Sequence, residues 1–220
     1  MNSESQSSWR CQLSTLWPHL VLVYSPIVIL ITAVAVFALM TGRPGSFFTR
    51  DPFVIARLPF YAGLISNVGI VLWCALCTVC LFNSVVLKKL ANGSDWGRFF
   101  LYSGILTFIL LFDDLFQFHR ILYPRLLHVS MALTSAAYAG LAIWLLWRFR
   151  GIMEQSEYLL LLLAFFFLGF SIVLDVTPML RFSRSFIADG FKLLGITSWL
   201  AYVARSGAQE IMRAFAAAHT

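Results

Sequence analysis

The sequence contains few charged residues. Asp, Glu, Lys and Arg make up only 12% of its 220 residues, whereas 60% are hydrophobic. Soluble domains carry about 25% charged residues, so the composition excludes an ordinary soluble globular protein. The mean hydropathy is +0.83. We therefore expect an integral membrane protein, whose membrane segments leave no length for a separate soluble domain.

Clustered cysteines and clustered basic residues are also scarce. Cys74, Cys77 and Cys80 are three of the four cysteines, and all three fall inside one apolar run. There we expect small packing residues rather than a metal site or a disulfide. The formal net charge is +6, but Lys and Arg are scattered in twos and threes beside apolar runs, as is typical of membrane-helix flanks. We expect no nucleic-acid partner.

Long apolar runs, in contrast, fill most of the chain. A helix needs about 20 apolar residues to cross about 30 Å of hydrocarbon. We predict an all-α, polytopic transmembrane helix bundle that forms one integral membrane domain over residues 1–220. About six spans are expected, over residues 20–40, 60–87, 99–120, 129–147, 158–174 and 186–203. Barrel strands are excluded because they are half as long and alternate in polarity.

Polar residues inside or beside these spans gather on one side of the predicted topology. An ionisable group in lipid costs about 2.5–3.5 kcal/mol on insertion scales, so it faces the bundle interior and pairs with a partner. The sequence therefore predicts a polar cluster in one leaflet, built from several helices: Asn67, Asp113, Asp114, Asp175, Asp189 and Lys192.

The third predicted span ends in the densest polar stretch, FDDLFQFHR. At 100° per residue, Asp113, Gln117 and Arg120 share one face of a regular helix, while His119 lies on the far side. Asp113 and His119 are then expected to face different ligands. In one interpretation Asp113 and Gln117 line a polar pocket and Arg120 holds an anion or a lipid headgroup. In the other, Asp113 pairs with Arg120 or Lys192 and only holds the bundle together.

The last predicted span contains Asp189 and Lys192, spaced i, i+3, and Trp199 continues the Lys192 face. A same-helix ion pair is one explanation. The alternative is that Lys192 neutralises Asp113 or Asp114 across the bundle, or serves as a proton-carrying or Schiff-base lysine.

A divalent metal is a further hypothesis for this region. His119 and His128 flank a short predicted loop, and together with Asp114 they offer ligands for Zn, Fe or Cu. Their spacing matches no compact metal-binding signature.

Two motifs carry a resemblance to other proteins. FDDLFQFH, followed some seventy residues later by ADGFKLLGITSWLAY, resembles a loose group of uncharacterised bacterial polytopic membrane proteins. Their third helix ends in DDLFxxH, usually followed by Glu, and their last helix has an acidic-x-x-Lys-x-x-Gly pattern. Arg120 departs from the first pattern. A distant analogy is the CREST class of membrane hydrolases, which is similar in placing Asp and His at one membrane face but has seven helices and a His pair in its last span.

These observations lead to a functional expectation without naming a substrate or deciding whether the chain is an enzyme. The favoured hypothesis is a lipid- or isoprenoid-acting enzyme or ligand site in the bacterial inner membrane. The catalytic candidates are Asp113, Asp114, His119 and Lys192. The substrate-binding candidates are Gln117, Arg120, Asp175, Asp189, Asn67 and Trp199.

Two other functional classes remain open. An accessory or assembly subunit of a larger membrane complex would keep the charged groups as static ion pairs. A proton- or ion-coupled carrier of small solutes would use the same Asp–Lys cluster. The expected partners are membrane lipids and either a membrane-protein partner or further copies of the chain.

Overall fold

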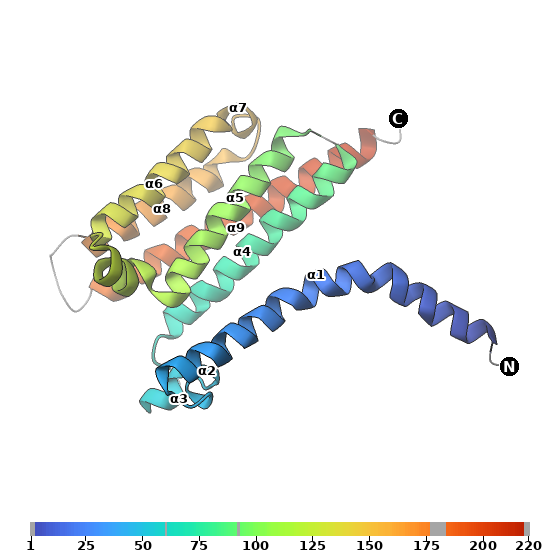
Figure 1. Cartoon of the computed structure of the whole chain (residues 1–220). Coiled ribbons are helices and arrows are strands. Elements are labelled where there is room, and N and C mark those ends of the chain that lie inside the picture. Colours follow the sequence, from blue (N-terminus) through green and yellow to red (C-terminus); the bar gives the residue numbers. More distant parts are fainter. Residues whose placement is uncertain (1–2, 60, 92, 177–183, 218–220) are drawn as a thin grey trace. The chain divides into compact units, whose positions relative to one another are not determined.

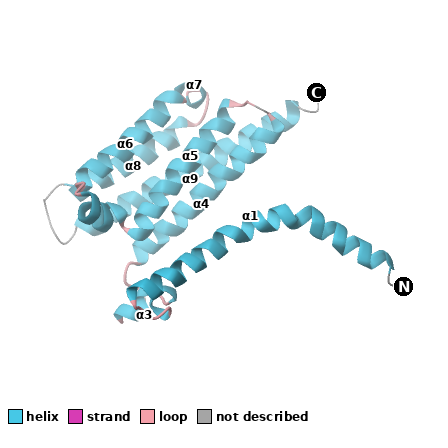
Figure 2. Cartoon of the chain, viewed as in Figure 1, coloured by secondary structure: helices cyan, strands magenta, loops and turns pink. Residues whose placement is uncertain are grey.

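The computed structural model describes the chain except residues 1–2, 60, 92, 177–183 and 218–220. Within the described residues every regular element is a helix and no strand occurs (Figure 2). The predicted all-α fold class is confirmed. The chain divides into two compact units, residues 1–62 and 63–220. The single membrane domain expected from the sequence stays a prediction.

The first unit is one long helix followed by two short ones: α1 (Ser3–Thr41), α2 (Ser46–Thr49) and α3 (Pro52–Ala56). The first predicted span lies entirely within α1. At the end of α1 the Phe37 ring meets the Phe48 ring of α2 edge to face, with centroids 5.7 Å apart. Asp51 caps α3 by accepting a hydrogen bond from the Phe53 N–H at 2.7 Å.

The second unit is a helical bundle. In chain order it consists of α4 (Leu64–Leu90), α5 (Asp95–Phe116), the π-helix η1 (Phe118–Leu127), α6 (Met131–Arg148), α7 (Arg150–Met153), α8 (Tyr158–Val176) and α9 (Arg184–Ala217). Figure 1 shows α4, α5 and α9 running alongside one another, and α8 packs along α9. α6 lies beside α8 and α5 but touches each of them only sparsely.

The helices have the length and apolarity of membrane spans. Among the described residues five helices qualify, namely α1, α4, α5, α8 and α9. η1 and α6 together make a sixth if this pair, bent by 117°, counts as one span. The expectation of about six helical spans is thereby confirmed, and the chain is a helical membrane protein.

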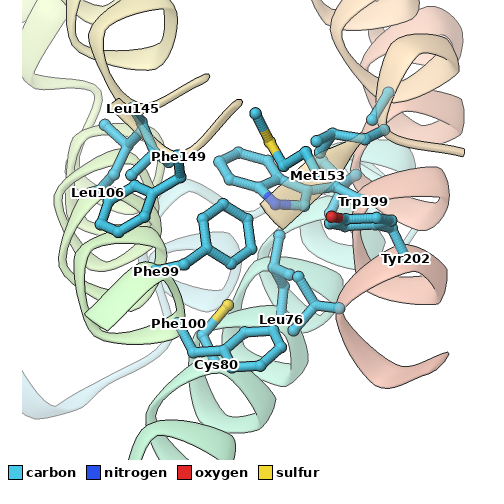
Figure 3. Packing of buried hydrophobic residues seen from close by; sticks show 14 of the residues in the cluster. Leu76, Cys80, Phe99, Phe100, Leu106, Leu145, Phe149, Met153, Trp199 and Tyr202 are labelled. Atoms are coloured by element: carbon cyan, nitrogen blue, oxygen red, sulfur yellow. The ribbon is translucent and has the colours of Figure 1, made fainter. Parts of the chain in front are cut away.

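The core of the second unit is a cluster of aromatic and aliphatic side chains. Figure 3 shows Phe99 near its centre, with Phe149 on one side and Tyr202 on another. The Phe99 centroid lies 5.6 Å from that of Phe149 and 6.3 Å from that of Tyr202, both in edge-on geometry. These contacts join α5 to the α6–α7 corner and to α9. They fix the end of the bundle opposite Asp113.

Several helix ends differ from the predicted spans, and two of them bear on the fold. The third span was expected to continue to residue 120, but α5 ends at Phe116. The sixth span was expected to end at residue 203, whereas α9 continues to Ala217. The predicted span stops at residue 203 because polar residues end the apolar run there. The helix continues because Ser206 and Gly207 face the bundle interior. On its exposed side the Arg205 guanidinium makes a two-point ion pair with Glu157.

The bidentate contact with Arg205 also affects the Glu157 carboxyl, which lies just before α8. Because the guanidinium hydrogen-bonds and attracts the ionised form, it holds the pKa of Glu157 below its ordinary value. This ion pair is exposed and contributes little to stability. The contact shows which turn of α9 lies beside the start of α8.

Close approach of α8 and α9 depends on Gly195. A Cβ atom built at this position would lie 2.6 Å from Leu168 Cγ and 3.0 Å from the Leu168 backbone nitrogen. A backbone atom cannot move aside as the end of a side chain can. Gly140 on α6 is a matched control, since a Cβ there would meet nothing within 4 Å.

We expect Gly195→Ala to destabilise the bundle by about 1–3 kcal/mol, the usual cost of overpacking. Gly140→Ala should leave stability unchanged or raise it by up to about 1 kcal/mol, because Ala favours helix more than Gly does. Thermal unfolding of both variants in mild detergent measures the difference. Equal melting temperatures for the two variants would contradict the proposed α8–α9 contact.

Candidate functional site

A reversal of the chain at Gln117 builds the site. Gln117 adopts the left-handed conformation, with φ 55° and ψ 39°, which is uncommon for a residue other than glycine. Its backbone N–H donates to the Asp113 carbonyl oxygen, and its side-chain Nε2 donates to the Asp114 carbonyl oxygen at 2.7 Å. These bonds end α5 and turn the chain into η1.

The reversal places His119 over Asp113. His119 Nδ1 lies 2.5 Å from Asp113 Oδ2, and the His119 backbone N–H donates to Asp113 Oδ1 at 3.0 Å. The two side chains are 15% and 7% exposed. The expectation that Asp113 and His119 face different ligands is therefore wrong. It assumed a regular helix through residue 120, and the helix is interrupted at Gln117.

Asp114 is paired with Lys192 of α9. Lys192 Nζ donates to both carboxylate oxygens, at 2.9 and 3.1 Å, whereas its distance to Asp189 Oδ1 is 3.9 Å. Of the two explanations for Lys192, the contact across the bundle is thus the closer one. Asp113 pairs with neither Lys192 nor Arg120.

Arg120 makes the third ion pair, with Asp175 at the end of α8. Its guanidinium nitrogen lies 3.1 Å from Asp175 Oδ2. The Arg120 side chain is half exposed and the Asp175 side chain less so. This contact ties η1 to α8, so the three pairs together join α5, η1, α8 and α9 at one end of the second unit.

A half-open cavity of about 330 Å³ lies between α4, α5, η1, α6, α8 and α9. One end is charged and is lined by Asp113, Asp114, His119, Arg120, Asp175 and Lys192. The remainder is mostly apolar and is lined by residues that include Trp73, Leu110, Leu146, Phe165, Leu168 and Trp199. A mostly apolar pocket with a few convergent polar groups is typical of small-molecule sites.

The cavity accounts for seven of the predicted site residues, namely Asp113, Asp114, His119, Arg120, Asp175, Lys192 and Trp199. Of the other four, three are substrate-binding candidates that do not line it. Gln117 is the turn residue that caps α5, and Asp189 lies half-buried beside Lys192. Asn67 is exposed on the first turn of α4, so its expected place in the polar cluster is wrong.

The hypothetical metal site is not assembled. Within the part of the chain that the structure describes, no three His, Cys, Asp or Glu side chains come together to hold a metal ion. Asp114 is held by Lys192 and His119 by Asp113. His128 is exposed at the other end of η1, where it caps the π-helix in the left-handed conformation.

Sequence reasoning missed the contribution of α6. Tyr138 lines the cavity, and its hydroxyl lies within interaction range of Asp113 and Tyr123. Ser135, Ala139 and Ala142 line it too. These positions follow an i, i+4, i+7 spacing, so small residues occupy one face of a helix. That stripe was the available signal, because small side chains facing a bundle leave space beside it.

The sequence contains no comparable signal that Trp73 lines the cavity. Trp73 lies in the middle of an apolar helix, where an aromatic residue is ordinarily a packing residue. Its ring contacts Trp199 edge to face, with centroids 6.2 Å apart.

Comparison with known proteins adds one finding. A family model described as "Domain of unknown function (DUF8692)" matches residues 26–206. The chain belongs to the DUF8692 family. All cavity-lining residues fall inside the matched range, so the cavity is part of the DUF8692 domain. No curated protein and no solved structure matches the chain.

The Asp114–Lys192 contact predicts non-additive effects of substitution. Asp114→Asn or Lys192→Met alone leaves an uncompensated buried charge, which costs about 3–5 kcal/mol. The double variant removes both charges, so its loss should be well below the sum of the two single losses. Thermal unfolding in detergent measures the cycle.

An exposed pair provides the control for this cycle. Arg98→Met removes the partner of Asp95 at the start of α5, where both side chains are about half exposed, and should cost less than about 1 kcal/mol. Additive losses for Asp114→Asn and Lys192→Met would show that the two charges are not coupled.

Proposed function

We propose that the chain is a membrane enzyme acting on a lipid or isoprenoid amphiphile in the bacterial inner membrane, with His119 as the acid–base residue and Asp113 as its positioning partner. One observation carries the proposal. The 2.5 Å His119–Asp113 contact belongs to the charged end of a half-open cavity whose remaining wall is apolar. Such a cavity offers separate surroundings for a polar head and a hydrocarbon chain.

The His119–Asp113 contact supports one assignment of the proton on the imidazole ring. An ionised Asp113 accepts a hydrogen bond from Nδ1–H and so selects the neutral tautomer in which Nε2 carries a lone pair. Nε2 can then take a proton from a hydroxyl group or a water molecule bound in the cavity. Two contacts, from the His119 backbone N–H and from the ring, hold Asp113 in place. The imidazole orientation is therefore fixed before a ligand arrives.

The neighbouring cations suit the charge that develops in such a step. Lys192 and Arg120 both line the cavity, and each has more N–H donors than its carboxylate partner occupies. A donor already in position stabilises an oxyanion without further reorganisation. In the proposed mechanism Lys192 and Arg120 provide this electrostatic stabilisation, and Asp114 and Asp175 hold them in position.

An accessory or assembly subunit is the second candidate, and the closed ion pairs favour it. Asp114, Lys192, Arg120 and Asp175 satisfy one another without any ligand. In this alternative a charged His119 would form a permanent ion pair with Asp113. The only role of this ion pair would be to hold η1 against α5.

Turnover tests the enzyme proposal. We expect the wild-type protein, reconstituted in vesicles of bacterial polar lipid extract, to convert at least one lipid species detected by mass spectrometry. His119→Ala should slow this conversion about 10²- to 10⁴-fold, the contribution of a positioned acid–base group. Asp113→Asn should slow it as well, because the amide no longer selects the tautomer.

The exposed His128 provides the matched control, and His128→Ala should retain full turnover. Circular dichroism and thermal unfolding verify that each variant is folded. Equal conversion by the His119→Ala and wild-type proteins would rule out the acid–base role.

A further inference from the structure

A second cavity continues the first along α6 and α8. Its volume is about 390 Å³, and it is lined mostly by apolar residues of α6, α7 and α8. It shares Ile143, Leu146 and Phe165 with the first cavity. These three side chains stand at the junction of the two cavities. We call the two cavities together the α6–α8 furrow, which lies between helices that run side by side in Figure 1.

The furrow has the length of a lipid chain. Its α6 lining runs from Met131, beside the charged end, to Leu146 and Trp147, and it continues to Arg150 of α7. Along α6 alone, from Met131 to Trp147, this distance is about 24 Å at 1.5 Å per residue, which exceeds the half of the about 30 Å bilayer core that one lipid chain crosses. Each volume is at the low end of the range for a single small-molecule site. Such a furrow suits one hydrocarbon chain rather than the two chains of a phospholipid.

Two buried donors in the first cavity lack an acceptor. The indole nitrogens of Trp73 and Trp199 have no hydrogen-bond partner, although the two residues are only 4% and 1% exposed. Both line the cavity. A buried donor left unpaired costs about 1–3 kcal/mol. Neither nitrogen is accessible from the cavity in this structure, so an oxygen atom of a bound molecule reaches one of them only when its indole ring turns towards the cavity.

The charge of the site restricts the head of such a molecule. Among the described side chains that line the cavity, three are carboxylates, Asp113, Asp114 and Asp175, and two are permanent cations, Lys192 and Arg120. With His119 neutral, as in the proposed mechanism, one excess negative charge remains. A phosphate head would add to this excess at short range, which is unfavourable.

We propose that the α6–α8 furrow binds a single-chain amphiphile with an uncharged, oxygen-bearing head, of the type of a long-chain monoester or monoamide. The head lies at His119, a carbonyl oxygen accepts from Trp73 or Trp199, and the chain runs past Leu146 towards Trp147. This inference rests on the proposed function for the chemistry at the head, and it names the substrate class.

Photo-cross-linking tests the position of the chain. The probe is a monohexadecanoyl glycerol with a diazirine at the end of its acyl chain, added to the full-length protein in lipid nanodiscs. Irradiation, digestion and mass spectrometry should locate the label on residues of the second cavity, such as Trp147, Met153 and Leu162. Unlabelled monohexadecanoyl glycerol should compete for labelling, and hexadecyl phosphate should compete at least tenfold less well.

Matched variants test the path of the chain. Leu146→Trp fills the junction of the two cavities and should abolish labelling of the second one. Leu141→Trp places the same bulk on the same helix at an exposed position outside both cavities, so labelling should persist.

Variants of the two indoles test the buried donors. Trp73→Phe and Trp199→Phe keep an aromatic ring but remove the N–H group. The loss of one hydrogen bond should weaken competition by monohexadecanoyl glycerol about 2- to 10-fold.

The outcomes separate this inference from the proposed function. Three outcomes would overturn the furrow assignment. The label could be spread over the lipid-facing helices, Leu146→Trp could leave the labelling unchanged, or hexadecyl phosphate could compete as well as monohexadecanoyl glycerol. His128→Ala should keep the labelling, since His128 is exposed at the far end of η1 and lines neither cavity. Lipid turnover that depends on His119 without furrow labelling refutes the furrow alone, and labelling without such turnover supports the furrow and refutes the enzyme.

Discussion

Two consecutive buried carboxylates set the main physical constraint on this structure. Asp113 and Asp114 are only 5% and 7% exposed, and they follow a mostly apolar stretch of α5. A buried charge without a partner is unfavourable by several kcal/mol. Because adjacent residues point about 100° apart on a helix, one partner cannot serve both groups. The bundle supplies His119 from the reversed chain for Asp113, and Lys192 from α9 for Asp114.

The shape of the cavity follows from these two pairings. The reversal at Gln117 replaces the last turn of a spanning helix with η1, and the bend of 117° between η1 and α6 sets the direction of α6. Small residues on the inner face of α6 then leave space rather than filling it, so a cavity remains next to the paired charges. Charge pairing thus determines the position of the site, and the small-residue face determines its size.

Much of the architecture could be predicted from the sequence because it depends on apolar run length. The spans, the helical class and the gathering of Asp113, Asp114, Asp175 and Lys192 all follow from the cost of placing polar groups in lipid. The turn at Gln117 could not be predicted, since no Gly or Pro marks it and its conformation is supported by long-range pairing. Pro124 does not mark the turn either, because it lies inside η1. The role of Trp73 depends on where the cavity lies, which a single helix does not reveal.

The protonation state of His119 distinguishes an acid–base residue from a static ion pair with Asp113. Nitrogen-15 NMR of the protein labelled at histidine, in detergent at neutral pH, reports it, and the His119→Ala variant identifies the signal. If His119 is the acid–base residue, we predict a neutral imidazole that is protonated at Nδ1 and bare at Nε2, the form that can accept a proton from a bound amphiphile. An imidazolium protonated at both nitrogens would contradict this prediction, because His119 and Asp113 would then be a static ion pair holding η1 to α5.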